Sequence, residues 1–152
     1  MFNTPERYAH QYINGFGSGL TPIEADALLQ WLGLSYGAIA HQVRYTDWDV
    51  SPEVFVSHWE TYGQLLISRA NSEHPFFTVA DNCRFRAVHD MHHILTGCRF
   101  DWEGELATYQ YAAQFAPRPI LWILRSEILG QAAVAITTGA FPEQKLVRTC
   151  VG

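Results

Sequence analysis

The sequence predicts an all-α fold, a single-domain bundle of about six helices spanning residues 1–152. Apolar residues recur at intervals of three and four through most of the chain, as is typical of helices with one buried face. Strong helix start signals, in which Thr or Ser precedes Pro and an acidic residue, occur at Thr21 and at Ser51. The only β-like segments, around Val79 and over residues 145–151, are too short to found a sheet, and the chain is long enough for one substantial core.

Two helices are predicted at the N-terminal end of the chain. Residues 5–14 begin with Pro5 at the first helical position and precede a glycine-rich segment. Thr21 opens a second helix over about residues 22–32, because its side chain can cap the helix while the Glu three positions later returns a hydrogen bond. We expect Gly33 to end this helix.

Two further helices are predicted before the centre of the chain. Small residues over 35–45 indicate a closely packed helix. Ser51 and Pro52 then repeat the start signal, and apolar residues at helical spacing continue the fourth helix to about residue 70. We predict no strand in this part of the chain.

A pair of helices is predicted over about residues 81–115. Asp81 or Asn82 can cap the first helix, and Gly97 is well placed to end it in the left-handed conformation. Asp101 can cap the second helix. Because the connection is short, we expect the two helices to lie antiparallel.

The last predicted helix covers about residues 119–138, after Pro117 has stopped the preceding one. It is the longest apolar stretch of the chain, but Arg125 and Glu127 lie near its first third and would be costly in a lipid core. We therefore predict a core helix. A peripheral membrane contact and a homodimer stay open, since either would follow from apolar surface exposed on this helix.

Four side chains of the central helix pair form a candidate metal site. His89 and His93 are four residues apart and therefore lie on one face of a helix, within reach of one ion. Asp90 is a candidate ligand or a hydrogen-bond acceptor that supports a ligand histidine. An antiparallel second helix can bring Glu105 opposite the histidines, whereas Glu103, two residues away, would face the other side.

This set of ligands predicts a divalent metal cofactor. Two imidazoles with one or two carboxylates suit Zn²⁺, with Fe²⁺ or Mn²⁺ as alternatives, and leave coordination positions open for water or substrate. The His-Asp pair also invites comparison with the phosphohydrolases named after that dipeptide. That comparison is weak, because those enzymes need a late Asp and the sequence has none after Asp101.

The same residues carry a resemblance to a known family. His89, Asp90, His93 and Glu105 are spaced as HDxxH, eleven residues and Glu, within the longer run FRAVHDMHHILTG and a Gly-Glu pair. The pattern resembles the hallmark of the ubiquinone (coenzyme Q) biosynthesis protein family, member four, over roughly residues 75–115. The resemblance implies an all-α protein that binds a divalent metal through these four side chains.

The resemblance also implies a function. That family associates peripherally with membranes, organises the enzymes of ubiquinone synthesis and is linked to oxidative decarboxylation of a polyprenylated ring. It implies a small hydrophobic aromatic or prenylated ligand, such as a quinone precursor, as partner. The alternative is a non-catalytic lipid-binding or scaffold protein with a structural or vestigial metal site.

Composition and the N-terminal sequence limit the class of partner and the cellular compartment that we expect. With a net charge of -5 and 10 basic residues that form no run, the chain is not expected to bind nucleic acid. Cys83, Cys98 and Cys150 form no CxxC pair, which favours a reducing compartment. The N-terminus shows no secretory or transit pattern. We therefore expect a cytoplasmic protein, with a peripheral position at the inner face of the membrane left open.

Overall fold

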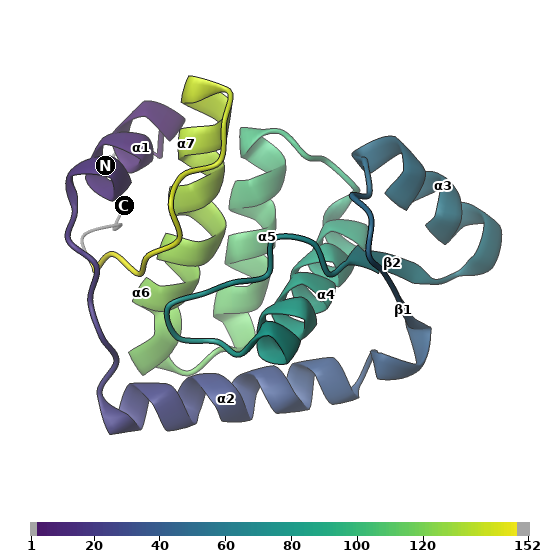
Figure 1. Ribbon diagram of the computed structural model, residues 1–152, viewed down its shortest axis with the longest axis horizontal. Coiled ribbons are helices and arrows are strands. Elements are labelled where there is room, and N and C mark those ends of the chain that lie inside the picture. Colours follow the sequence, from purple (N-terminus) through teal and green to yellow (C-terminus); the bar gives the residue numbers. More distant parts are fainter. Residues whose placement is uncertain (1–2, 149–152) are drawn as a thin grey trace.

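The computed structural model describes residues 3–148, which form helices around one main core and a short two-stranded sheet (Figure 1). The predicted all-α class is confirmed. The α-helices are α1 (Pro5–Asn14), α2 (Pro22–Gly37), α3 (Pro52–Tyr62), α4 (Val79–Thr96), α5 (Trp102–Phe115), α6 (Leu121–Leu124) and α7 (Gln131–Thr138). Because α6 and α7 belong to one continuous helix, the described residues form six helices, as predicted.

The candidate site lies where α4 and α5 meet. α5 packs between α4 and the C-terminal helix, and α1 packs against α7 (Figure 1). α2 runs crosswise below these helices in the same view and contacts α4. α3 and the small sheet lie beyond α4, so α4 is covered on both sides.

The first two helices begin as the sequence predicts. Thr4 caps α1, and Thr21 forms a capping box with Glu24 in which both reciprocal hydrogen bonds are present, at 3.2 and 2.9 Å. The predicted end of α2 at Gly33 is wrong, because the helix continues to Gly37. A glycine inside a helix costs only about 1 kcal/mol relative to alanine, and the packing of the surrounding turns offsets that cost.

The structure corrects the prediction for residues 35–70, where it contains two strands. A 3-10 turn, η1 (Ala40–Gln42), leads into β1 (Val43–Thr46) instead of a helix. α3 ends at Gly63, whose left-handed φ of 63° stops the helix well before residue 70. The chain then enters β2 (Leu65–Ser68), which pairs parallel to β1 with Val43 opposite Leu65.

The central helix pair is confirmed, with one change at its start. Thr78, and not Asp81 or Asn82, caps α4 by accepting a hydrogen bond from the Asp81 amide. Gly97 ends α4 with a φ of 111°, and Asp101 caps α5, both as predicted.

The last helix is also confirmed, but it is irregular. A 3-10 turn, η2 (Arg118–Ile120), opens it, and a π-helical segment, η3 (Arg125–Gly130), separates α6 from α7. By length and composition Arg118–Thr138 passes as a membrane span, although half of its most apolar window is buried within the domain. The side chains of Ile123, Leu124 and Leu129 are fully enclosed. This helix therefore forms part of the core.

The described end of the chain returns to the start of α2 and is tied there by ion pairing. Residues 145–148, expected to look β-like, form no strand, and Cys150 lies outside the described residues. Arg148 donates to both carboxylate oxygens of Glu24, at 2.8 and 2.9 Å, and covers the Trp122 ring with its guanidinium 4.0 Å from the ring centroid. The Trp122 indole donates to the same carboxylate at 2.7 Å.

Because of this ion-pair cluster, the free energy of unfolding should decrease at acid pH. The Arg148 guanidinium, helped by Thr21 and Trp122 and opposed by burial, holds the pKa of Glu24 well below its ordinary value of 4.5. A carboxyl with a lowered pKa contributes stability above that ordinary value and loses it as pH falls toward the folded pKa. We expect Glu24→Gln to unfold more easily at pH 7 by about 1–3 kcal/mol. Urea unfolding from pH 7 to pH 3 should show this difference shrinking below about pH 4.5; a constant difference would contradict it.

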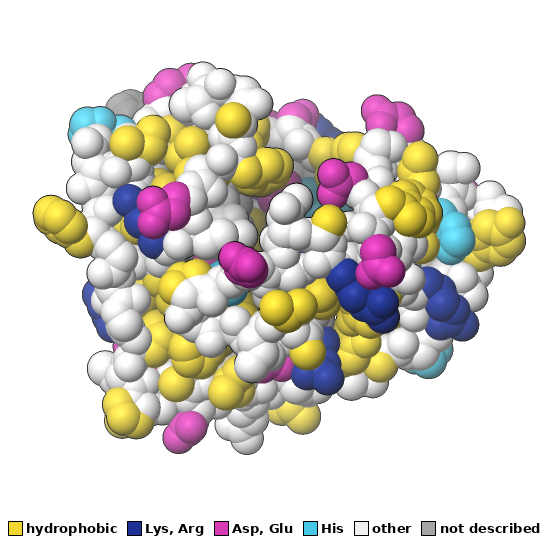
Figure 2. Space-filling model, viewed as in Figure 1, with side chains coloured by type: hydrophobic (Ala, Val, Ile, Leu, Met, Phe, Trp, Pro, Cys, Tyr) yellow, Lys and Arg dark blue, Asp and Glu magenta, His cyan; other side chains and the backbone are white. Residues whose placement is uncertain are grey.

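Charged and apolar side chains are mixed over the surface. On the face in Figure 2, basic, acidic and hydrophobic side chains are scattered among polar side chains and backbone. Among the exposed large apolar residues are Phe16, at 92% exposure, and Phe141, at 79%. Phe141 is of interest because it also lines the cavity described below.

Candidate metal centre

The site is built by the hairpin of α4 and α5. His89, Asp90 and His93 lie on the last two turns of α4, and Glu105 lies in the first turn of α5. The four-residue connection after Gly97 turns the chain back, so the start of α5 faces the end of α4. The structure thus brings together the four residues that the sequence predicts.

Three of the four side chains point their terminal atoms at one another. His93 Nε2 lies 3.1 Å from His89 Nε2 and 3.1 Å from Glu105 Oε1. The other carboxylate oxygen of Glu105, Oε2, lies 3.2 Å from His89 Nε2. The His93 side chain is 2% exposed, that of Glu105 13% and that of His89 19%, so the cluster is buried but open on one side.

These separations fit a shared metal ion. Donor atoms bound at about 2.0–2.2 Å, at tetrahedral or octahedral angles, lie roughly 3.0–3.5 Å apart. Glu105 Oε2 is buried, and its one close polar neighbour among the described residues is His89 Nε2, at 3.2 Å. A buried carboxylate oxygen with so few partners is costly unless a cation completes its coordination. The donor set, two imidazoles and a carboxylate, is one that Zn²⁺, Fe²⁺ and Mn²⁺ accept.

Asp90 belongs to the cluster but stands slightly apart. Its carboxylate and ligand atoms of His89 and His93 all lie within 4.8 Å of one another. Burial raises the pKa of Asp90, although the nearby charges of His89 and His93 oppose the rise. A divalent ion would favour the ionised carboxylate. Asp90 is therefore placed either to bind the ion or to balance its charge.

The metal-free site is held together by opposite charges. Burial disfavours the charged form of Glu105, but the charge of His89 and hydrogen bonds from His89 and His93 outweigh it and lower the pKa of Glu105 to about 2. Burial likewise lowers the pKa of His89, yet Glu105 and Asp90 raise it by more. A proton on His89 thus supplies part of the positive charge that a bound metal ion would supply. Metal binding must displace this proton, because imidazole binds metals in its neutral form.

Neighbouring side chains fix the histidine rings. Phe100 stacks on His93, with ring centroids 4.6 Å apart and an angle of 26° between the planes. His92 is half-buried, with its ring 4.9 Å from that of Tyr111 on α5. Burial and the charges of the two neighbouring histidines lower the pKa of His92 to about 4. His92 therefore stays neutral and outside the cluster.

The cluster opens into a large cavity. The cavity has a volume of about 1100 Å³ and is enclosed by α4, the start of α5, η3, α7 and the segments around residues 49–50, 68–73 and 141–144. Its apolar walls include Phe85, Phe100, Ile128 and Phe141. A cavity of this size accommodates a small organic molecule next to the metal site.

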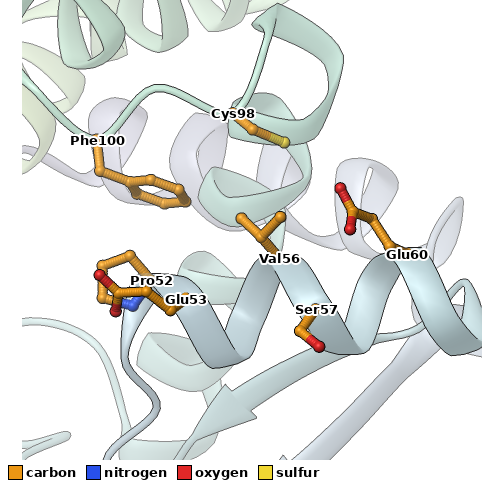
Figure 3. A pocket seen from close by; sticks show the side chains of 7 residues that line it. All are labelled: Pro52, Glu53, Val56, Ser57, Glu60, Cys98 and Phe100. Carbon is orange, nitrogen blue, oxygen red and sulfur yellow. The ribbon is translucent and has the colours of Figure 1, made fainter.

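Phe100 also lines a second, more open pocket of about 360 Å³, which is drawn in Figure 3. In Figure 3, Phe100 and Cys98 lie over Val56 of α3, and Glu60 lies on the next turn. Burial and the charge of Glu60 raise the pKa of the Cys98 thiol, which disfavours the reactive thiolate. We assign this pocket no chemistry.

Other residues singled out in the sequence have different positions. Glu103 is exposed and does not join the cluster, as predicted. Tyr109 does not line the cavity; its hydroxyl accepts a hydrogen bond from Arg125 at 2.9 Å and so joins α5 to η3. Arg86 donates to the backbone carbonyls of Ser68 and Ala70 and holds that segment at the cavity wall.

Sequence analysis missed a second polar group in the cavity. Glu127, on η3, lines the cavity and pairs with His74. The only signal in the sequence is that Glu127 lies inside the longest apolar stretch. A carboxylate in such a stretch is expected to have a partner, but the sequence does not indicate which residue that partner is.

Comparisons with known proteins identify no relative: no protein-family model, no curated protein and no solved structure matches the chain. The resemblance carried by His89, Asp90, His93 and Glu105 therefore stays a prediction.

Proposed function

We propose that the protein binds one divalent metal ion through His89, His93 and Glu105, with Asp90 as a further ligand or a supporting carboxylate. One observation carries this proposal: donor atoms from two helices converge to 3.1–3.2 Å in a buried site at the wall of a large cavity. Zinc suits this donor set best, and iron or manganese are the alternatives.

The cavity supports a ligand with an apolar body. Its aromatic and aliphatic walls favour a small hydrophobic aromatic molecule, the class that includes quinone precursors. A bound divalent ion would supply Lewis acidity toward an oxygen of that ligand. The chain's own residues hold the ligand: Phe100 orients His93 and walls the cavity, and Phe85 and Ile128 exclude water from it.

Two roles use this arrangement. In the first, the protein is a metal-dependent enzyme of aromatic or quinone metabolism, with oxidative decarboxylation as the reaction that the family resemblance suggests. In the second, the protein is a lipid-binding carrier or scaffold that presents such a ligand to other enzymes. The cavity volume of about 1100 Å³ favours ligand binding in both. They differ in whether loss of the ion abolishes a reaction or leaves ligand binding intact.

Metal content tests the proposal directly. We expect about one equivalent of zinc, iron or manganese in protein purified without a histidine tag, and loss of nearly all of it in His93→Ala. His92→Ala is the matched control, because it removes the adjacent imidazole, which lies outside the cluster. Elemental analysis gives the metal content, and circular dichroism checks that each variant is helical. Absence of metal from the wild type after reconstitution, or equal loss in both variants, would contradict the proposal.

A further inference from the structure

A buried hydrogen-bonded pair, His74 and Glu127, lies at the cavity wall beside the C-terminal helix. His74, in the segment before α4, places Nε2 2.8 Å from Oε1 of Glu127. The two side chains are 0% and 4% exposed. They are 53 residues apart in the chain, and neither belongs to the metal cluster.

The hydrogen bonds around His74 determine where its proton lies. Its Nδ1 accepts hydrogen bonds from the backbone amides of Phe76 and Phe77, both at 3.0 Å. A nitrogen that accepts two N–H groups carries no proton, so the proton of the neutral ring is on Nε2. His74 therefore donates to Glu127 and fixes the orientation of its carboxylate.

The other oxygen of Glu127 remains available to a ligand. Oε2 receives no hydrogen bond from the described residues, and the side chain lines the cavity. Glu127 lies in the π-helical segment η3, and such local widening of a helix is frequent at functional sites. The carboxylate thus presents one fixed, unpaired acceptor from the C-terminal helix.

The charges of the cavity wall select the kind of ligand. Five carboxylates line the cavity, from Asp49, Glu73, Asp90, Glu105 and Glu127, against the two basic residues Arg69 and Arg86. The guanidinium of Arg86 is already bound to backbone carbonyls, and Arg69 pairs with Asp47 at 3.7 Å. Asp90 and Glu105 face the metal site, so the charge that remains beside a ligand group reaching Glu127 is negative, and there a hydrogen-bond donor is favoured over an anionic group.

We propose that Glu127, positioned by His74, accepts a hydrogen bond from a hydroxyl or N–H group of an aromatic ligand in the cavity. The proposal deepens the function above and rests on it, since it concerns a ligand of the same cavity. It assigns Glu127 to ligand recognition and makes the cavity selective for ligands that carry a hydrogen-bond donor at this position.

Two fluorinated probes test this recognition by fluorine NMR titration. 4-Fluorophenol carries a donor, and 4-fluoroanisole replaces its proton with a methyl group. We expect the wild type to bind 4-fluorophenol about tenfold more tightly than 4-fluoroanisole, because only the phenol can donate a hydrogen bond to the charged carboxylate.

Glu127→Gln keeps the size of the side chain and can still accept the bond from His74, so the fold is preserved. In this variant the preference for 4-fluorophenol should fall toward one. Glu73→Gln is the matched control, because it removes an equal charge from an exposed side chain at the same cavity and should keep the preference. An unchanged preference in Glu127→Gln, equal loss in both variants or no preference in the wild type would each overturn the proposal. Metal content of the same samples tests the metal site separately.

Discussion

Glu105→Ala is expected to lose the metal ion, whereas Glu103→Ala keeps it. Among residues 3–148, Glu105 supplies the only carboxylate within 3.2 Å of both histidines, and its removal leaves the two imidazoles and Asp90 on one helix. Since even the loss of a supporting group weakens metal binding about 10–100-fold, we expect the loss of this ligand to weaken it roughly hundredfold or more. Competition with a chromogenic chelator measures the change in affinity.

The same pair of variants separates a ligand from a general charge effect. Both substitutions remove one negative charge from the first turn of α5, but Glu103 is exposed. A bound ion stabilises the folded state by about 2.7 kcal/mol at a hundredfold excess over its Kd. Chelator should therefore lower the melting temperature of the wild type and of Glu103→Ala but leave Glu105→Ala nearly unchanged. Equal sensitivity of all three proteins to chelator would argue against Glu105 as a ligand.

Gly104→Ala is expected to disrupt both the fold around the site and metal binding. A Cβ at this position would lie 1.9 Å from the backbone oxygen of Arg99 and 2.5 Å from its carbonyl carbon. Backbone atoms cannot rotate away as a flexible side chain can, so the start of α5 must move, and Glu105 moves with it. We expect a loss of about 3 kcal/mol in the free energy of unfolding, at the upper end for an overpacked site.

Gly33→Ala provides the control for this substitution. Gly33 lies inside α2, and a Cβ there would meet nothing within 4 Å. Alanine is the better helix former, so the control should be neutral or more stable by up to about 1 kcal/mol. Urea unfolding and metal analysis of both variants check the prediction. Wild-type stability and full metal content in Gly104→Ala would contradict the prediction, because they would show that the Arg99 backbone moves aside at little cost.

The structure gives a physical reason for the Gly-Glu pair of the family-like pattern. Sequence analysis noted Gly104 before Glu105 only as part of that resemblance. In the structure the absence of a side chain lets the Arg99 backbone pass against α5, which sets the position of Glu105. The requirement for glycine thus arises from the hairpin and not from the ion.

The sequence alone determined the features that depend on local interactions. Caps at Thr21, Ser51 and Asp101 satisfy the first amides of their own helices, and Gly97 adopts the left-handed conformation that ends α4. The ligand spacing of His89 and His93 follows from the helical repeat. The turn between the two helices is short enough to predict that Glu105 lies opposite the two histidines.

Only the tertiary structure decided the features that depend on distant segments. β1 and β2 are four residues each and pair with each other, although α3 lies between them in the sequence. The apolar run Leu65–Ile67 is therefore equally compatible with a helix until its partner strand is known. The pairing of His74 with Glu127 joins residues 53 positions apart, and no local pattern specifies it. Local hydrogen bonds determine where most helices begin, and the helical repeat determines the spacing of the histidine ligands. The cavity forms, and Glu127 comes to line it, only when the helices pack together.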